Sequence, residues 1–312
     1  MNAKDTAARF STELHRVIVG QEETIRLAFM ALTLGGHILI EGVPGTAKTL
    51  LARSVARLVG GTFKRIQFTP DLMPSDIVGT SIFEIATSSF RMRLGPVFAN
   101  VVLADEVNRA PAKTQAALLE AMEERQVTLE GEPHALPDPF LVLATQNPVE
   151  YEGTYPLPEA ELDRFLFKAV VRYPETGEER SILRLHDKGR PLDELARLQE
   201  MENGALESSR AEIEKVTVED SVVDYIVRIV EETRRSADLI LGASPRAGVH
   251  LLRAAKAAAA VEGRDFVTPD DVKTFVPPTL RHRVILKAEA EIEGVDADAA
   301  LRRVLARLDV PR

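Results

Sequence analysis

The feature that most constrains this fold is a loop at residues 42–49, with the sequence Gly-Val-Pro-Gly-Thr-Ala-Lys-Thr. It follows a short apolar segment, residues 37–41, and precedes residues 50–59, whose apolar side chains recur at helical spacing. In a strand–loop–helix unit of this kind, the backbone N–H groups of the loop and the positive end of the helix point into one space. The loop therefore predicts an anion site that can cradle phosphate groups, built on an α/β fold.

The first half of the chain repeats this alternation of apolar strands and amphipathic helices. Several of the apolar segments are almost continuous, which is typical of parallel strands buried on both faces. A helix is expected over residues 113–124. We expect strands at residues 37–41, 63–68, 101–104, 140–145 and 167–171. This pattern predicts a three-layer αβα core around a parallel sheet.

The pattern changes at residues 173–177, Tyr-Pro-Glu-Thr-Gly, and no comparable strand candidate follows. Apolar spacing predicts a helix over residues 221–235. Ser244 before a proline, and Thr268 before a proline with Asp271 three residues later, are typical helix starts. We therefore expect an α/β core over residues 1–173 and an all-helical lid domain over residues 174–312, with a hinge near Pro174.

Composition narrows the classes of function. The 312 residues suit two domains, and the absence of cysteine excludes disulfides, thiolate zinc sites and thiol nucleophiles. The net charge of −9 disfavours nucleic-acid binding through bulk positive charge. The six histidines show no metal-ligand spacing, so packing or surface positions are expected for them. Because the polar N-terminus is not a signal peptide and no apolar stretch reaches about 20 residues, we expect a cytoplasmic protein without a membrane span.

The phosphate loop carries two residues with specific chemistry. Lys48 is expected to reach the β- and γ-phosphates of a nucleotide, and the Thr49 hydroxyl to ligate Mg²⁺. Ala47 stands where such loops usually have glycine before the lysine. It fits if residue 47 has the backbone angles of a helix start.

Two carboxylates, Asp105 and Glu106, follow the predicted strand at residues 101–104. Carboxyl ends of parallel strands meet at one edge of the sheet, where ligands bind. Beside a phosphate loop, Asp105 would hold the Mg²⁺ shell and Glu106 would polarise a water for attack on the γ-phosphate. Without that loop, the pair would be an ordinary solvated helix start.

Three further residues each allow a functional and a purely structural interpretation. Asn147 follows the predicted strand at residues 140–145, and its amide could orient the attacking water or simply form a turn before proline. Arg164 and Arg246 are single arginines at element boundaries. Either one could bind γ-phosphate charge or lie on the surface.

Taken together, these motifs resemble the AAA+ ATPases, and among them the MoxR family. The similarity spans roughly residues 19–286 and is most specific over residues 105–115, Asp-Glu-Val-Asn-Arg-Ala-Pro-Ala-Lys-Thr-Gln. MoxR-like loops also resemble this one at Ala47. The resemblance implies that Asn147 is sensor 1, Arg164 an arginine finger donated to a neighbouring subunit, and Arg246 sensor 2 in the lid.

The resemblance also implies ATP and Mg²⁺ as cofactors and a homo-oligomeric ring, most often a hexamer. The partner would be a protein client, for which this family suggests a von Willebrand factor A-domain protein. The catalytic residues would be Glu106, Arg164, Asn147 and Lys48. Metal ligation would fall to Thr49 and Asp105. The nucleotide would contact Val19, Gly20, Gln21, Gly42, Val43, Pro44, Gly45, Thr46, Ala47, Lys48, Thr49, Leu50 and Arg246.

Residues 77–97 and 126–139 lie where this group of AAA+ proteins carries hairpin insertions. They are either pore-side loops that engage a client or ordinary surface hairpins. Arg91 and Arg93 would suit a DNA-facing hairpin, whereas Glu130 and Glu132 would oppose DNA.

The function expected from the sequence is MgATP hydrolysis that remodels or activates protein partners. The alternative is a DNA-dependent ATPase or translocase of the related MCM-like clade. A P-loop kinase fits the helical lid and its arginines poorly. A scaffold that binds nucleotide without hydrolysis is disfavoured, because no catalytic position is substituted.

Overall fold

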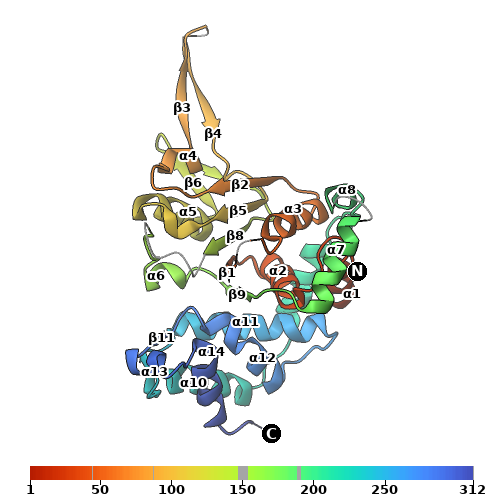
Figure 1. Ribbon diagram of the computed structural model, residues 1–312, viewed down its shortest axis with the longest axis vertical. Coiled ribbons are helices and arrows are strands. Elements are labelled where there is room, and N and C mark those ends of the chain that lie inside the picture. Colours follow the sequence, from red (N-terminus) through yellow and green to blue (C-terminus); the bar gives the residue numbers. More distant parts are fainter. Residues whose placement is uncertain (44, 87, 147–153, 188–190, 312) are drawn as a thin grey trace.

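Five parallel strands form the central sheet, in the order β2-β5-β8-β1-β9 (Figure 1). The computed structural model describes residues 1–43, 45–86, 88–146, 154–187 and 191–311. All five predicted strands are confirmed, each within one residue at either end. They are β1 (Ile38–Gly42), β2 (Phe63–Gln67), β5 (Val101–Asp105), β8 (Leu141–Gln146) and β9 (Phe167–Val171).

Helices cover both faces of this sheet, which accounts for the almost continuous apolar runs of its central strands. Ile38 and Ile40 of β1 pack into the core that also holds α1 (Ala3–Leu14), α2 (Glu22–Leu34) and α3 (Lys48–Leu58). Leu39, between them, points to the opposite face and packs with α5 (Ala112–Glu124). The predicted three-layer αβα core is therefore present.

The second half is mainly helical, as predicted. Its helices are α7 (Thr176–Asp187), α8 (Pro191–Leu195), α9 (Ala205–Lys215), α10 (Asp220–Arg235), α11 (Pro245–Val261), α12 (Pro269–Leu280), α13 (Ala288–Ile292) and α14 (Ala297–Ala306). A short ladder of β10 (Leu239–Leu241) and β11 (Ile285–Leu286) joins two of its loops. Both predicted helix starts are confirmed: Ser244 accepts from the Ala247 N–H, and Thr268 and Asp271 form a capping box.

The core and the lid share apolar packing through the N-terminal helices. α1 and α2 contact both α9 and α11, and one continuous apolar cluster includes side chains of all four helices. The lid is therefore fixed to the core by more than the chain connection at Pro174. The boundary at residues 173 and 174 stays a prediction.

Both predicted hairpin segments form hairpins. β3 (Gly79–Glu84) pairs with β4 (Ser89–Leu94) and projects from the body of the molecule, beyond α4 (Pro74–Val78) (Figure 1). β6 (Gln126–Leu129) pairs with β7 (Glu132–Ala135). Among the helices described, none has the length and apolar character needed to cross a bilayer.

Candidate nucleotide site

A cavity of about 1400 Å³ opens at the carboxyl ends of β1, β5 and β8. The structure brings most of the predicted site residues to its walls: Val19, Gln21, Gly42, Gly45, Thr46, Ala47, Lys48, Thr49, Leu50, Asp105 and Glu106. Gly20 and Val43 are neighbours of the lining: a side chain at Gly20 would collide with Glu178, and the Val43 carbonyl accepts from the Thr46 hydroxyl at 3.1 Å. Pro44 and Asn147 lie outside the described residues. Residues from distant parts of the first half thus face one space.

The backbone of the phosphate loop turns through two left-handed residues. Gly45 has φ +83°, and Ala47, which directly precedes α3, has φ 57° and ψ 19°. The expectation that Ala47 has the angles of a right-handed helix start is therefore wrong. The chain reverses at this residue before α3 begins, and the Gln21 amide donates to the preceding carbonyl, that of Thr46, at 2.9 Å. A left-handed alanine costs about 1–2 kcal/mol, so the loop holds this residue against its own preference.

Lys48 extends back across the loop. Its Nζ donates to the Gly42 carbonyl at 2.6 Å. Burial lowers the pKa of Lys48, while the carboxylates of Asp105 and Glu106 act to raise it. A half-buried ammonium beside two carboxylates and the start of a helix suits the phosphates of a nucleotide bound with a divalent cation.

Thr145, at the end of β8, holds both candidate carboxylate residues, Asp105 and Glu106, in place. Its hydroxyl donates to Asp105 Oδ1 at 2.6 Å and accepts from the backbone N–H of Glu106 at 2.9 Å. Glu106 itself has a left-handed backbone, with φ 57°. The hydroxyl therefore fixes the turn that directs one carboxylate after the other towards the cavity.

The sequence interpretation missed two polar side chains from β2 that contact these carboxylates. Arg65 Nη2 lies 2.5 Å from Asp105 Oδ2, and Gln67 Nε2 donates to Glu106 Oε2 at 2.8 Å. β2 pairs with β5 so that Gln67 lies opposite Asp105. The signal was available in the alternation of polar residues along β2, but only the strand order assigns them to this site.

The far wall of the cavity comes from the second half of the chain. α7 contributes apolar and polar side chains, and the lid contributes Arg281 and Asp298. Arg281 Nε lies 2.9 Å from Asp298 Oδ1, and Arg281 Nη1 lies 3.5 Å from Glu23 Oε1. The cavity therefore lies between the core, α7 and the ends of α12 and α14 in the lid.

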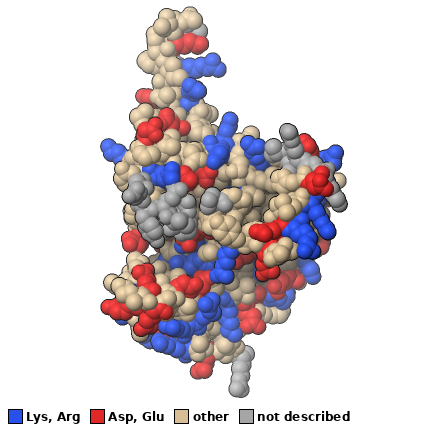
Figure 2. All heavy atoms as spheres, in the orientation of Figure 1, with Lys and Arg blue, Asp and Glu red and all other residues tan. Residues whose placement is uncertain are grey.

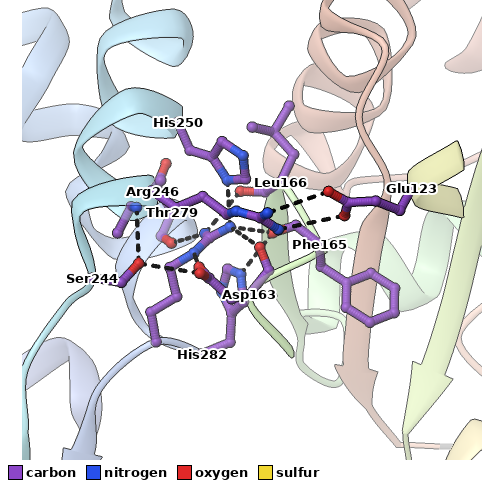
Figure 3. A network of polar contacts seen from close by, with 11 residues as sticks. Glu123, Asp163, Phe165, Leu166, Ser244, Arg246, His250, Thr279 and His282 are labelled. Atoms are coloured by element: carbon purple, nitrogen blue, oxygen red, sulfur yellow. Dashed lines mark hydrogen bonds and ion pairs between the residues drawn. The ribbon is translucent and has the colours of Figure 1, made fainter. Parts of the chain in front are cut away.

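Arg164 and Arg246 are the predicted residues that the structure places elsewhere. Arg164 donates to the Leu119 carbonyl at 2.9 Å, and Arg246 forms a two-pronged contact with Glu123 at 3.2 and 3.4 Å (Figure 3). Both partners belong to α5, and neither arginine lines the cavity. As placed here, neither guanidinium faces the phosphate loop of its own subunit.

Known proteins are similar to this chain in sequence and in architecture. Residues 37–167 match the model of the ATPase family associated with various cellular activities (AAA), and residues 231–304 match an AAA lid domain. The chain is 45% identical to "Chaperone MoxR1" of Mycobacterium tuberculosis, over 98% of this chain and 83% of that protein. This chain belongs to the MoxR family of AAA+ ATPases.

Other relatives agree with the MoxR assignment. "Protein MoxR" of Methylorubrum extorquens is 33% identical over 93% of this chain and 90% of its own length. A crystal structure of a Cytophaga hutchinsonii protein superposes with a TM-score of 0.90 at 41% identity, and covers 99% of this chain and 96% of that one. Almost the whole length of this MoxR-family chain therefore has the fold of a known structure, with an αβα core followed by a helical lid.

Proposed function

We propose that this MoxR-family protein binds ATP with Mg²⁺ in the 1400 Å³ cavity and hydrolyses it. The observation that carries the proposal is the shared wall of that cavity, where Lys48 and Thr49 of the phosphate loop meet Asp105 and Glu106. Lys48 would neutralise phosphate charge, and Thr49 and Asp105 would hold the metal shell. A bound Mg²⁺ would supply charge stabilisation to the phosphoryl group.

Glu106 is the proposed base that activates water. Its carboxylate accepts from Gln67, and its backbone N–H is fixed by Thr145. A positioned base contributes about 10²–10⁴-fold to such a reaction. Asn147 would help to orient the same water.

Arg164 is the proposed arginine finger, and it would act on the ATP of a neighbouring subunit. Its absence from the wall of its own cavity supports this role, as does its partial exposure, 28% of the side chain. An arginine supplied to a neighbour requires an assembly, for which we propose a ring, a hexamer by family resemblance. Arg246 remains the proposed sensor 2 of the lid, although its guanidinium contacts Glu123 of α5 and does not line the cavity.

The assembly is proposed to act on protein partners, a role that the name "Chaperone MoxR1" gives to the M. tuberculosis relative. The proposed location is the cytoplasm. The projecting β3–β4 hairpin supports a protein partner. Paired residues share a face of a hairpin, so Phe83, Phe90 and Met92 form one apolar face. Phe83 and Phe90 are 51% and 73% exposed, and the hairpin surface is mostly uncharged in the view shown (Figure 2). A von Willebrand factor A-domain protein remains the family-based candidate for the client.

Mixing two inactive variants tests hydrolysis and the ring together. Alone, Arg164→Ala should lose about 10³–10⁵-fold in turnover, and Glu106→Gln should bind ATP without hydrolysing it. In a mixture, the intact site of an Arg164→Ala subunit meets the intact finger of a Glu106→Gln subunit, so activity should return. Co-assembled mixtures that stay inactive would contradict a finger donated between subunits.

A measurement of ATP hydrolysis also tests the alternative function, a DNA-dependent ATPase or translocase. Addition of single-stranded DNA should leave the rate of ATP hydrolysis by the wild-type protein unchanged. A stimulation that disappears at high salt would favour the alternative instead.

A further inference from the structure

Three consecutive lid residues, Arg281, His282 and Arg283, contact the chain segment that carries Arg164. Figure 3 shows His282 of the lid beside Asp163, Phe165 and Leu166 of that segment. Their hydrogen bonds reach residues 163–168, from the residue before Arg164 into β9. All three are buried, with 9%, 6% and 7% of their surface exposed. The lid therefore holds the backbone segment that carries Arg164, the arginine proposed to reach the ATP of a neighbouring subunit.

Arg283 makes most of these contacts. Its Nε lies 2.6 Å from Asp163 Oδ1, and its Nη2 donates to the carbonyls of Asp163 at 3.0 Å and Phe165 at 2.5 Å. Its Nη1 donates to the Leu166 carbonyl at 3.3 Å. One guanidinium therefore fixes the backbone on both sides of Arg164.

A second lid element holds the other oxygen of the same carboxylate. Ser244, the N-cap of α11, donates from Oγ to Asp163 Oδ2 at 3.1 Å. His250, also on α11, accepts from Arg283 through Nδ1. Burial lowers the pKa of His250 to about 3, with the charge of Arg283 acting in the same direction, so this imidazole is a neutral acceptor at pH 7.

The Asp163–Arg283 pair cannot be separated without stranding a charge. Only 1% of the Arg283 side chain is exposed, and 21% of the Asp163 side chain. Leaving one member of a buried pair alone is far more costly than moving both together. Segment 163–166 must therefore follow any movement of the lid in which Arg283 takes part.

The other end of the three-residue stretch faces the nucleotide cavity. Arg281 lines that cavity and contacts Asp298, while its Nη1 donates to the Lys168 carbonyl at 3.2 Å. The same short stretch thus touches the cavity of a subunit and the segment that carries its finger.

From this arrangement we propose that Arg283 and Ser244 are positioning residues for the arginine finger: the lid of each subunit sets the geometry in which Arg164 is presented to the next subunit. The inference rests on the proposed function, because it needs Arg164 to act on a neighbour. The lid would then transmit the state of its own nucleotide cavity to the neighbouring site.

The test uses the mixing assay with the changes placed only in the finger donor. Acceptor subunits carry Arg164→Ala and a native lid, and donor subunits carry Glu106→Gln, so every hydrolysed ATP reports on the donated finger. Donors with Arg283→Lys added keep the charge but lose the planar fork. They should restore about 10- to 100-fold less activity, the loss expected from a misplacement of about 1 Å.

Matched controls separate positioning from a general weakening of the lid. Arg264→Lys changes another lid arginine whose Nη2 lies 2.6 Å from a buried carboxylate, that of Asp271, which lies elsewhere in the lid. Donors with Arg264→Lys should restore activity as well as the parent donor. For a milder comparison, Ser244→Ala and Thr268→Ala each remove a helix N-cap of the lid, but only Ser244 contacts Asp163.

The outcomes distinguish the donation of Arg164 between subunits from its positioning by Arg283 and Ser244. If the parent donor fails to restore activity, the proposed donation of the finger is wrong. If the parent donor succeeds and donors with Arg283→Lys or Ser244→Ala restore activity equally well, the positioning role is wrong. Equal losses in both members of each matched pair would show a structural effect of the lid and would also overturn it.

Discussion

Replacing His37 with glutamine should flatten the pH dependence of stability of this protein. The imidazole directly precedes β1, is 3% exposed and packs against the ring of Phe140, with 5.4 Å between the ring centroids. Nδ1 accepts from the Val142 N–H at 3.0 Å, and Nε2 therefore donates to the Met122 carbonyl at 3.2 Å. Both ring nitrogens are used by the neutral form, so protonation would break a hydrogen bond and bury a charge.

The magnitude follows from linkage. Burial lowers the pKa of His37 to about 3, and the charge of Arg125 acts in the same direction. Below about pH 6.5 the unfolded chain takes up a proton that the folded chain refuses, so stability falls as the pH falls. Between pH 7.5 and pH 5 this amounts to about 2 kcal/mol. At pH 5 the result is nearly the same for any folded pKa below about 4.

Urea denaturation of both proteins at pH 7.5, 6 and 5 measures this effect. The wild type should lose about 2 kcal/mol more free energy of unfolding over this range than His37→Gln does. His15→Gln, at an exposed position, serves as the control and should follow the wild type. If His37→Gln and the wild type lose stability in parallel, the argument that His37 stays neutral in the fold is refuted.

Three further predictions concern named contacts. Ala47→Gly should raise the free energy of unfolding by up to about 1 kcal/mol, because relief of the left-handed alanine exceeds the added entropy of the unfolded chain; thermal or urea denaturation measures it. Thr145→Val removes the hydroxyl that holds Asp105, and should lower kcat about 10- to 100-fold with little change in the Kd for ATP. Asp271→Asn removes the charge that faces Arg264 and weakens the capping box of α12, while Arg264 keeps Glu262 as a partner. It should destabilise the protein by about 1–2 kcal/mol, whereas an unchanged denaturation midpoint would contradict the assigned contacts.

Much of the core could be predicted from local sequence. A strand buried on both faces needs an almost unbroken apolar run, and β5 and β8 each have one. The phosphate loop is also a local motif, since its glycines, lysine and threonine lie within eight residues. The helix starts at Ser244 and Thr268 follow from hydrogen bonds within three residues. Strands, loops and helix starts that depend on such short-range interactions can be predicted without knowing the fold.

The features that the sequence interpretation missed depend on contacts between distant segments. Arg65 meets Asp105 only because β2 is the neighbour of β5 in the sheet. The left-handed Ala47 is set by the path into α3 and by a hydrogen bond to the loop from Gln21. Arg246 pairs with α5 because of how the lid docks, which no spacing in the sequence encodes.

The most direct test of ATP hydrolysis in this cavity is phosphate release by wild type and Glu106→Gln, measured with the affinity of each for MgATP. We expect equal affinity and a loss of about 10²–10⁴-fold in turnover for the variant. Glu124→Gln, at the exposed end of α5, is the matched control and should retain the wild-type rate. A Glu106→Gln protein that releases phosphate at the wild-type rate would contradict the role of Glu106 in hydrolysis in this cavity.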